Sequence, residues 1–95
     1  ARAWAAGQVE ARLDEGGEPP AIGRVLDWHR GRGRRVISLL LDRTPPVVAC
    51  VALPHDPDAP ALVGVAGGRT LTAAWRGAAL ELHQVHLARV GGAGR

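Results

Sequence analysis

Two apolar runs separated by a basic, glycine-containing turn are the feature that most constrains the fold of this chain. The first run extends from residue 21 to Trp28 and His29, and the second extends from Val36 to Leu41. Between them, residues 30–35 read Arg-Gly-Arg-Gly-Arg-Arg and carry four of the twelve basic residues. Short apolar runs joined by a glycine-containing turn are typical of a β-hairpin. The sequence therefore predicts a hairpin over residues 21–42 that presents a cationic loop.

Three further strands are predicted after this hairpin. Residues 47–53 are rich in β-branched side chains and follow a proline-containing turn. Residues 69–75 alternate apolar and polar side chains, as a fourth strand would. Residues 78–90 form the predicted fifth strand, where the apolar spacing changes phase between Leu82 and Val85. We expect a β-bulge there, because a bulge supplies the one extra residue that the change of phase requires.

The remaining segments are predicted to lie outside these strands. Residues 1–20 form an N-terminal appendage and linker, in which residues 1–13 fit either a short helix or a strand. The linker ends with two glycines, two prolines and three acids, which continue neither element. Residues 54–60 contain three prolines and are expected to be an irregular crossover. Residues 61–65 are expected to be one helical turn or a plug, and residues 91–95 a flexible tail.

Five short strands with a bulged last strand predict a small all-β domain, closed or nearly closed into a barrel over residues 21–90. The length of 95 residues suffices for one hydrophobic core and not for two. The apolar content of 46% indicates a chain that folds and does not remain disordered.

The order and spacing of these segments resemble the OB-fold of anticodon-binding and single-strand-binding domains. The similar features are Gly23-Arg24-Val25 on the first strand, Ile37 and Leu40-Leu41-Asp42 on the second, Gly67-Gly68 before the fourth, and Leu80-x-Leu82-x-x-Val85-x-Leu87 on the last. The second strand lacks the aromatic residue common in that family, and Ala73-Ala74 stands where a glycine is frequent. The resemblance covers residues 21–90 and implies a five-stranded OB-like Greek-key barrel.

This resemblance also implies a ligand site, because OB-folds usually bind their ligand across the second and third β-strands, between the loop that joins strands one and two and the loop that joins strands four and five. In this sequence those loops are residues 30–35 and Arg76-Gly77. Arginine pairs with phosphate oxygens and tryptophan stacks on bases, which favours single-stranded DNA or RNA held mainly through its phosphates. The residues predicted to bind nucleic acid are Trp28, His29, Arg30, Arg32, Arg34, Arg35, Trp75 and Arg76. Two alternatives stay open, since the arginine turn could be a solvated loop and the tryptophans could fill the core of a chain without Phe or Tyr.

A role in protein–protein contact is the alternative function. The same small domain could dock onto a partner protein or form a homodimer through an exposed strand edge or through the N-terminal segment. The net charge of +3 is modest for a nucleic-acid-binding protein and agrees with this alternative.

No catalytic, metal or cofactor site is predicted. The single Cys50 excludes an internal disulfide and is expected to be a buried thiol. A zinc site would need to combine Cys50 and His55 with His83-x-x-His86. Residues three apart on a strand point to opposite faces, unless the predicted β-bulge brings the two histidines together. Catalytic and nucleotide-binding motifs are absent, so the protein is not expected to be an enzyme. The chain has no apolar run of membrane-spanning length and no signal-peptide pattern, so we expect a cytoplasmic protein.

Overall fold

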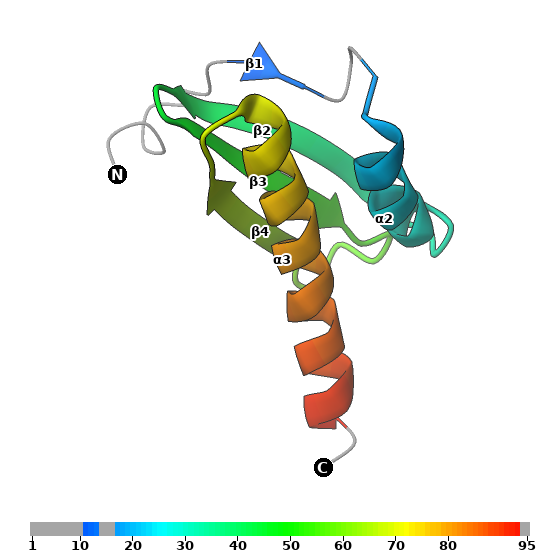
Figure 1. Ribbon diagram of the computed structural model, residues 1–95. Helices are drawn as coiled ribbons and strands as arrows, with labels where there is room; N and C mark the ends of the chain where they lie inside the picture. The colour runs from blue at the N-terminus through cyan, green and yellow to red at the C-terminus, as the bar shows by residue number, and fades with distance from the viewer. Residues whose placement is uncertain (1–10, 14–16, 94–95) are drawn as a thin grey trace.

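A computed structural model describes residues 11–13 and 17–93, and it contains an antiparallel sheet with two helices packed on one face (Figure 1). The elements, in chain order, are β1 (Ala11–Arg12), α2 (Pro20–Arg30), β2 (Arg35–Arg43), β3 (Pro46–Leu53), β4 (Leu62–Gly67) and α3 (Leu71–Ala93). None of the helices in these residues is both long and apolar enough to cross a membrane.

The predicted all-β barrel is wrong. The described strands form one open sheet in the order β1-β2-β3-β4, with antiparallel pairing between neighbours. The segment predicted as the first strand of the hairpin is the helix α2, and the predicted fourth and fifth strands are parts of the single helix α3. Residues 61–65, expected as a helical turn or plug, lie largely in β4. The strands predicted at residues 36–41 and 47–53 are confirmed as β2 and β3.

The helix α2 forms because its buried residues repeat with a helical period. Ile22, Leu26 and His29 are separated by four and three residues, and all three are buried on the side that faces the core. Pro20 occupies the first turn, where its missing N–H costs nothing and its fixed φ angle suits a helix. The chain then reverses through Gly33, whose φ of +82° favours glycine.

The helix α3 likewise follows from residue spacing and composition. Its buried residues are Ala74, Trp75, Ala78, Ala79 and Leu82. These residues are separated by alternating steps of one and three residues, which places them on one side of a helix. The three-residue step from Leu82 to Val85 belongs to the same helical period, so the predicted β-bulge near His83 does not exist.

A close approach at Gly64 holds α3 against the sheet. A Cβ atom at Gly64 would collide with the carbonyl oxygen of Ala78 and the backbone nitrogen of Leu82. The small side chains of α3 and the bare backbone of β4 therefore let the helix lie nearer to the strand than larger residues would permit.

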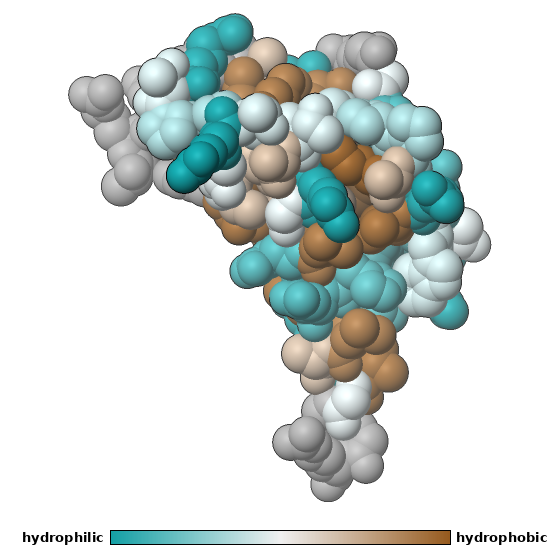
Figure 2. Space-filling model, in the orientation of Figure 1, coloured by the Kyte–Doolittle hydropathy of each residue, from teal (hydrophilic) through white to brown (hydrophobic). Residues whose placement is uncertain are grey.

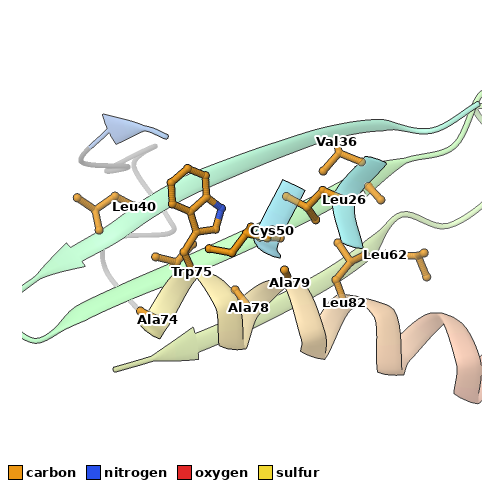
Figure 3. Packing of buried hydrophobic residues seen from close by; sticks show 13 residues of the cluster. Leu26, Val36, Leu40, Cys50, Leu62, Ala74, Trp75, Ala78, Ala79 and Leu82 are labelled. Carbon is orange, nitrogen blue, oxygen red and sulfur yellow. The ribbon is translucent and has the colours of Figure 1, made fainter. Parts of the chain in front are cut away.

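The core lies between the sheet and the two helices (Figure 3). In the sheet, Ser38 of β2 is paired with Cys50 of β3, and Cys50 is paired with Gly64 of β4. The indole Nε1–H of Trp75 donates a hydrogen bond of 2.9 Å to the hydroxyl oxygen of Ser38, and that oxygen lies 3.5 Å from the sulfur of Cys50. Cys50 is buried, as predicted. Trp75 is only 5% exposed, so it is a core residue and not a platform for a ligand.

Candidate functional site

Three histidines gather where the end of α2 packs against α3. His29 in the last turn of α2 is completely buried, while His83 and His86 come from one side of α3. The ring centroid of His29 lies 5.3 Å from that of His83 and 5.4 Å from that of His86. Trp28 contacts all three rings at centroid distances of 4.9 to 5.2 Å. We call these four residues the histidine cluster.

Hydrogen bonds from Arg34 order the cluster. The Nη1 atom of Arg34 donates to Nδ1 of His29 across 2.8 Å, and Nη2 donates to Nδ1 of His86 across 3.4 Å. A guanidinium group has only donors, so both Nδ1 atoms must be unprotonated acceptors. The proton of neutral His29 then lies on Nε2, which donates to Nδ1 of His83 across 3.1 Å. This assignment, inferred from the hydrogen-bond network, leaves His83 with its own proton on Nε2.

Burial and nearby positive charge lower the pKa of two of these imidazoles, His29 and His86. The pKa of His29 is lowered from 6.5 to about 4, mainly by burial, then by the charge of Arg34, with smaller contributions from His83, His86 and Arg32. Burial and the charge of Arg34 also lower the pKa of His86. His29 is therefore neutral near pH 7, and it orients Arg34 without cancelling the charge of the guanidinium group.

A pocket of about 320 Å³ opens beside Arg34. It is lined by Arg34, Ala52, Pro54, Ala59, Pro60, Leu62, His86, Arg89 and Val90. The two arginines and His86 supply hydrogen-bond donors, whereas the other lining side chains are apolar and offer no acceptor. We call this the Arg34 pocket. Its chemistry suits an anion with several oxygen atoms.

The structure brings together part of the predicted binding set. The guanidinium carbon of Arg32 lies 4.0 Å from the ring centroid of Trp28, and Trp28 is 39% exposed. Arg34 is half-buried beside this pair, and Arg35 is exposed where β2 begins. His29 belongs to the same place, but its burial makes it a support for Arg34 and not a contact surface.

The other residues predicted to bind nucleic acid either lie away from this surface or have their charge paired with a carboxylate. Arg30 forms ion pairs with Glu18 and Asp27, and the hydrogen bond to Glu18 raises the pKa of the guanidinium group. Arg76 is exposed on α3, seven residues before His83, and Trp75 lies in the core.

Residues of α3 contribute to the site in a way that the sequence prediction missed. His83 and His86 were considered only as zinc ligands on a strand, and Arg89 was not considered. On a helix, residues three apart lie on neighbouring positions of one face, which places His83, His86 and Arg89 in a row. The helical spacing of the apolar residues in α3 was the signal that could have revealed this row.

The described residues include no group of three or more His, Cys, Asp or Glu side chains placed to hold a metal ion. In the histidine cluster, both ring nitrogens of His29 are already engaged by Arg34 and His83. Cys50 lies in the core beside Ser38.

Comparisons with protein-family models, with curated proteins and with solved structures find no match to this chain. Its function is therefore inferred from the chemistry of the site.

Proposed function

We propose that this protein binds single-stranded nucleic acid at the surface where α2, β2 and α3 meet. The observation that carries this proposal is the environment of Arg34, whose partners among the described residues are two imidazoles and no carboxylate. A guanidinium group held in place by neutral acceptors keeps its full positive charge. A phosphate group is the complementary partner for such a preorganised cation.

The donors that Arg34 retains set the geometry of phosphate binding. A guanidinium group has five N–H donors, and the two bonds to His29 and His86 use one on each terminal nitrogen. Arg34 can therefore still donate in a forked arrangement to two phosphate oxygens. Arg89 lines the same pocket, and Arg35 is the next residue along the chain. These arginines provide the neighbouring charges that a strand with regularly spaced phosphates requires.

Trp28 and Arg32 supply the contact to a base. The guanidinium group of Arg32 lies over the indole ring of Trp28, and Arg32 is exposed. A base can replace this group on the ring, which frees Arg32 to bind a phosphate. Stacking of a base on an aromatic side chain contributes about 1–3 kcal/mol and depends little on sequence. The proposed interface therefore binds mainly the phosphate backbone of the nucleic acid and has little preference for base sequence.

Fluorescence anisotropy with labelled ten-nucleotide strands, measured at about 50 and 200 mM salt, tests this function. We expect affinity to fall steeply with salt, because each neutralised phosphate releases counterions. The Arg34→Gln variant should bind about tenfold more weakly. The slope of log affinity against log salt concentration should become shallower by about one, because one phosphate contact is lost. The matched control is Arg69→Gln, an exposed arginine in the turn before α3, which should change affinity by less than about twofold. Absence of binding at the lower salt concentration, or equal losses in both variants, would refute the proposal.

Self-association through β4 is a second candidate function. In the described part of the chain, β4 lies at the edge of the sheet and consists of Leu-Val-Gly-Val-Ala-Gly. Val63 and Val65 are 42% and 37% exposed on the face opposite the helices. Natural edge strands usually carry charges, prolines or bulges that prevent pairing, and β4 has no charge and no proline. Two copies related by a twofold axis could pair their β4 strands antiparallel.

Light scattering coupled to size-exclusion chromatography distinguishes this second candidate. We expect the wild-type chain to elute as a dimer and the Val65→Lys variant as a monomer, because a lysine on the edge strand opposes pairing. A wild-type chain that remains monomeric at micromolar protein concentrations would exclude self-association through β4.

A further inference from the structure

We propose that a second pocket, between α2 and α3, binds a small carboxylate with an apolar body. This pocket has a volume of about 320 Å³ and is lined by Arg24, Val25, Trp28, His83 and Leu87. It shares no lining residue with the Arg34 pocket. Its size lies near the lower limit of small-molecule sites, which span about 300–1,000 Å³. We call it the Trp28 pocket.

The walls of the Trp28 pocket are apolar and partly open to solvent. Val25 is half-buried, while Trp28 and Leu87 are exposed to 39% and 54%. Apolar surface is visible along the C-terminal half of α3 (Figure 2), where Leu87 and Val90 are the exposed large apolar residues. A branched or flat hydrocarbon group placed between the indole ring of Trp28 and the aliphatic side chains of Val25 and Leu87 would remove apolar area from water.

His83 presents a fixed hydrogen-bond donor at this pocket. The hydrogen bonds from Arg34 to His29 and from His29 to His83 occupy Nδ1 of His83 and leave its proton on Nε2. Among the described residues, no side-chain nitrogen or oxygen is buried without a hydrogen-bond partner. Nε2 of His83 makes no described hydrogen bond, so this atom is not completely buried, and His83 is one of the residues that line the pocket.

The lining is mainly apolar, and its polar side chains belong to Arg24, Trp28 and His83. A guanidinium group and an indole carry only donors, and His83 keeps only its Nε2–H once Nδ1 is occupied. Asp27, the acid nearest to Arg24 along α2, is engaged by Arg30. A carboxylate matches this arrangement because it offers two acceptor oxygens and a negative charge, and no donor that would face another donor. An amide of the same shape offers one acceptor and brings two N–H donors.

This inference does not depend on nucleic-acid binding, because it assigns a different ligand to a different pocket. Arg34 enters it only as the group that sets the protonation of His29 and, through His29, of His83. A direct measurement of the His83 tautomer is therefore the first test. The imidazole ¹⁵N chemical shifts of the full chain near pH 7 should show Nδ1 of His83 unprotonated and Nε2 protonated. A proton found on Nδ1 would overturn the proposal.

The second test is a titration of the ¹⁵N-labelled full chain with 4-methylpentanoate, followed by the indole N–H signal of Trp28. The signal is assigned by its loss in Trp28→Phe. We expect a saturable shift with the carboxylate, and at least tenfold weaker binding of 4-methylpentanamide, which has the same shape without the charge. Equal affinities for the two compounds would overturn the proposal, as would the absence of any shift with the carboxylate.

Variants complete the test. Arg24→Gln and His83→Leu should each weaken carboxylate binding tenfold or more, since each removes one of the donors. The matched control is Arg76→Gln, an exposed arginine of α3 outside the pocket lining, which should leave the affinity unchanged. Arg24 is exposed, so its replacement preserves the fold and gives a result even if His83→Leu unfolds. Unchanged affinity in Arg24→Gln would refute the assigned site.

Discussion

Burial of His29 in its neutral form makes the stability of the protein depend on pH. In the unfolded chain this imidazole has an ordinary pKa of 6.5, whereas in the folded protein burial and the charge of Arg34 lower the pKa to about 4. Above pH 6.5 both states are neutral and the residue contributes no pH dependence. As the pH falls below 6.5, the unfolded chain binds a proton that the folded protein excludes, so the free energy of unfolding decreases until the pH approaches 4.

The magnitude follows from this difference in pKa. One pKa unit corresponds to about 1.4 kcal/mol, so the full shift corresponds to about 3 kcal/mol. About 2 kcal/mol of this is lost by pH 5, where the unfolded imidazole is almost fully protonated. Because small domains are stable by about 5–15 kcal/mol, a loss of this size would be a substantial fraction of the stability of a domain of this length.

Urea unfolding at pH 7.5, 6 and 5, with the wild-type chain and the His29→Gln variant, measures the effect. Glutamine cannot titrate, yet its side-chain amide retains a donor that can face His83 and an acceptor that can face Arg34. Carboxylate groups titrate in both proteins, so the difference between the two pH profiles isolates His29. We expect the wild-type chain to lose about 2 kcal/mol more than the variant between pH 7.5 and 5.

The control is His55→Gln, since His55 is exposed in the loop between β3 and β4. Its profile should parallel that of the wild-type chain. Parallel profiles for wild type and His29→Gln would refute the reasoning, because the folded protein would then bind a proton at His29 as readily as the unfolded chain.

Two further predictions concern the core and are tested by urea denaturation at pH 7.5. Ser38→Ala should lower the free energy of unfolding by about 1–3 kcal/mol, because it leaves the indole N–H of Trp75 buried without its acceptor; an unchanged midpoint would contradict this. Gly64→Ala should cost at least about 1–3 kcal/mol, since its methyl group would meet the backbone of Ala78. The matched change Gly91→Ala meets no neighbouring atom and should stabilise the helix by up to about 1 kcal/mol; equal effects of the two glycine changes would contradict the close approach.

The candidate site could be predicted only in part. The cationic residues after Trp28 were recognised because four arginines fall within six residues. Their partners could not be recognised, since His86 is 52 residues away from Arg34 along the chain. Charge density is a local property of a sequence, whereas the hydrogen bonds that orient Arg34 depend on how α2 and α3 pack.

The two helices were predicted as strands because the apolar patterns at residues 21–29 and around Leu82 fit either a helix or a strand. Residues 21–29 form an apolar run that is too short for its period to be decisive. The useful signals were Pro20 at the first turn and the spacing of Ile22, Leu26 and His29. In α3, the step from Leu82 to Val85 was interpreted as an irregularity in a strand, although it is regular for a helix.

The sequence by itself determined the strands β2 and β3, the turn between them, the burial of Cys50 and the position of the arginines along the chain. These features follow from local chemistry, namely β-branched residues between prolines, a lone thiol in an apolar run, and a count of charges. Only the tertiary structure decided the layered architecture, the role of Trp75 and the composition of the site. Each of these depends on which surfaces are buried together, and burial couples residues that lie far apart in the sequence.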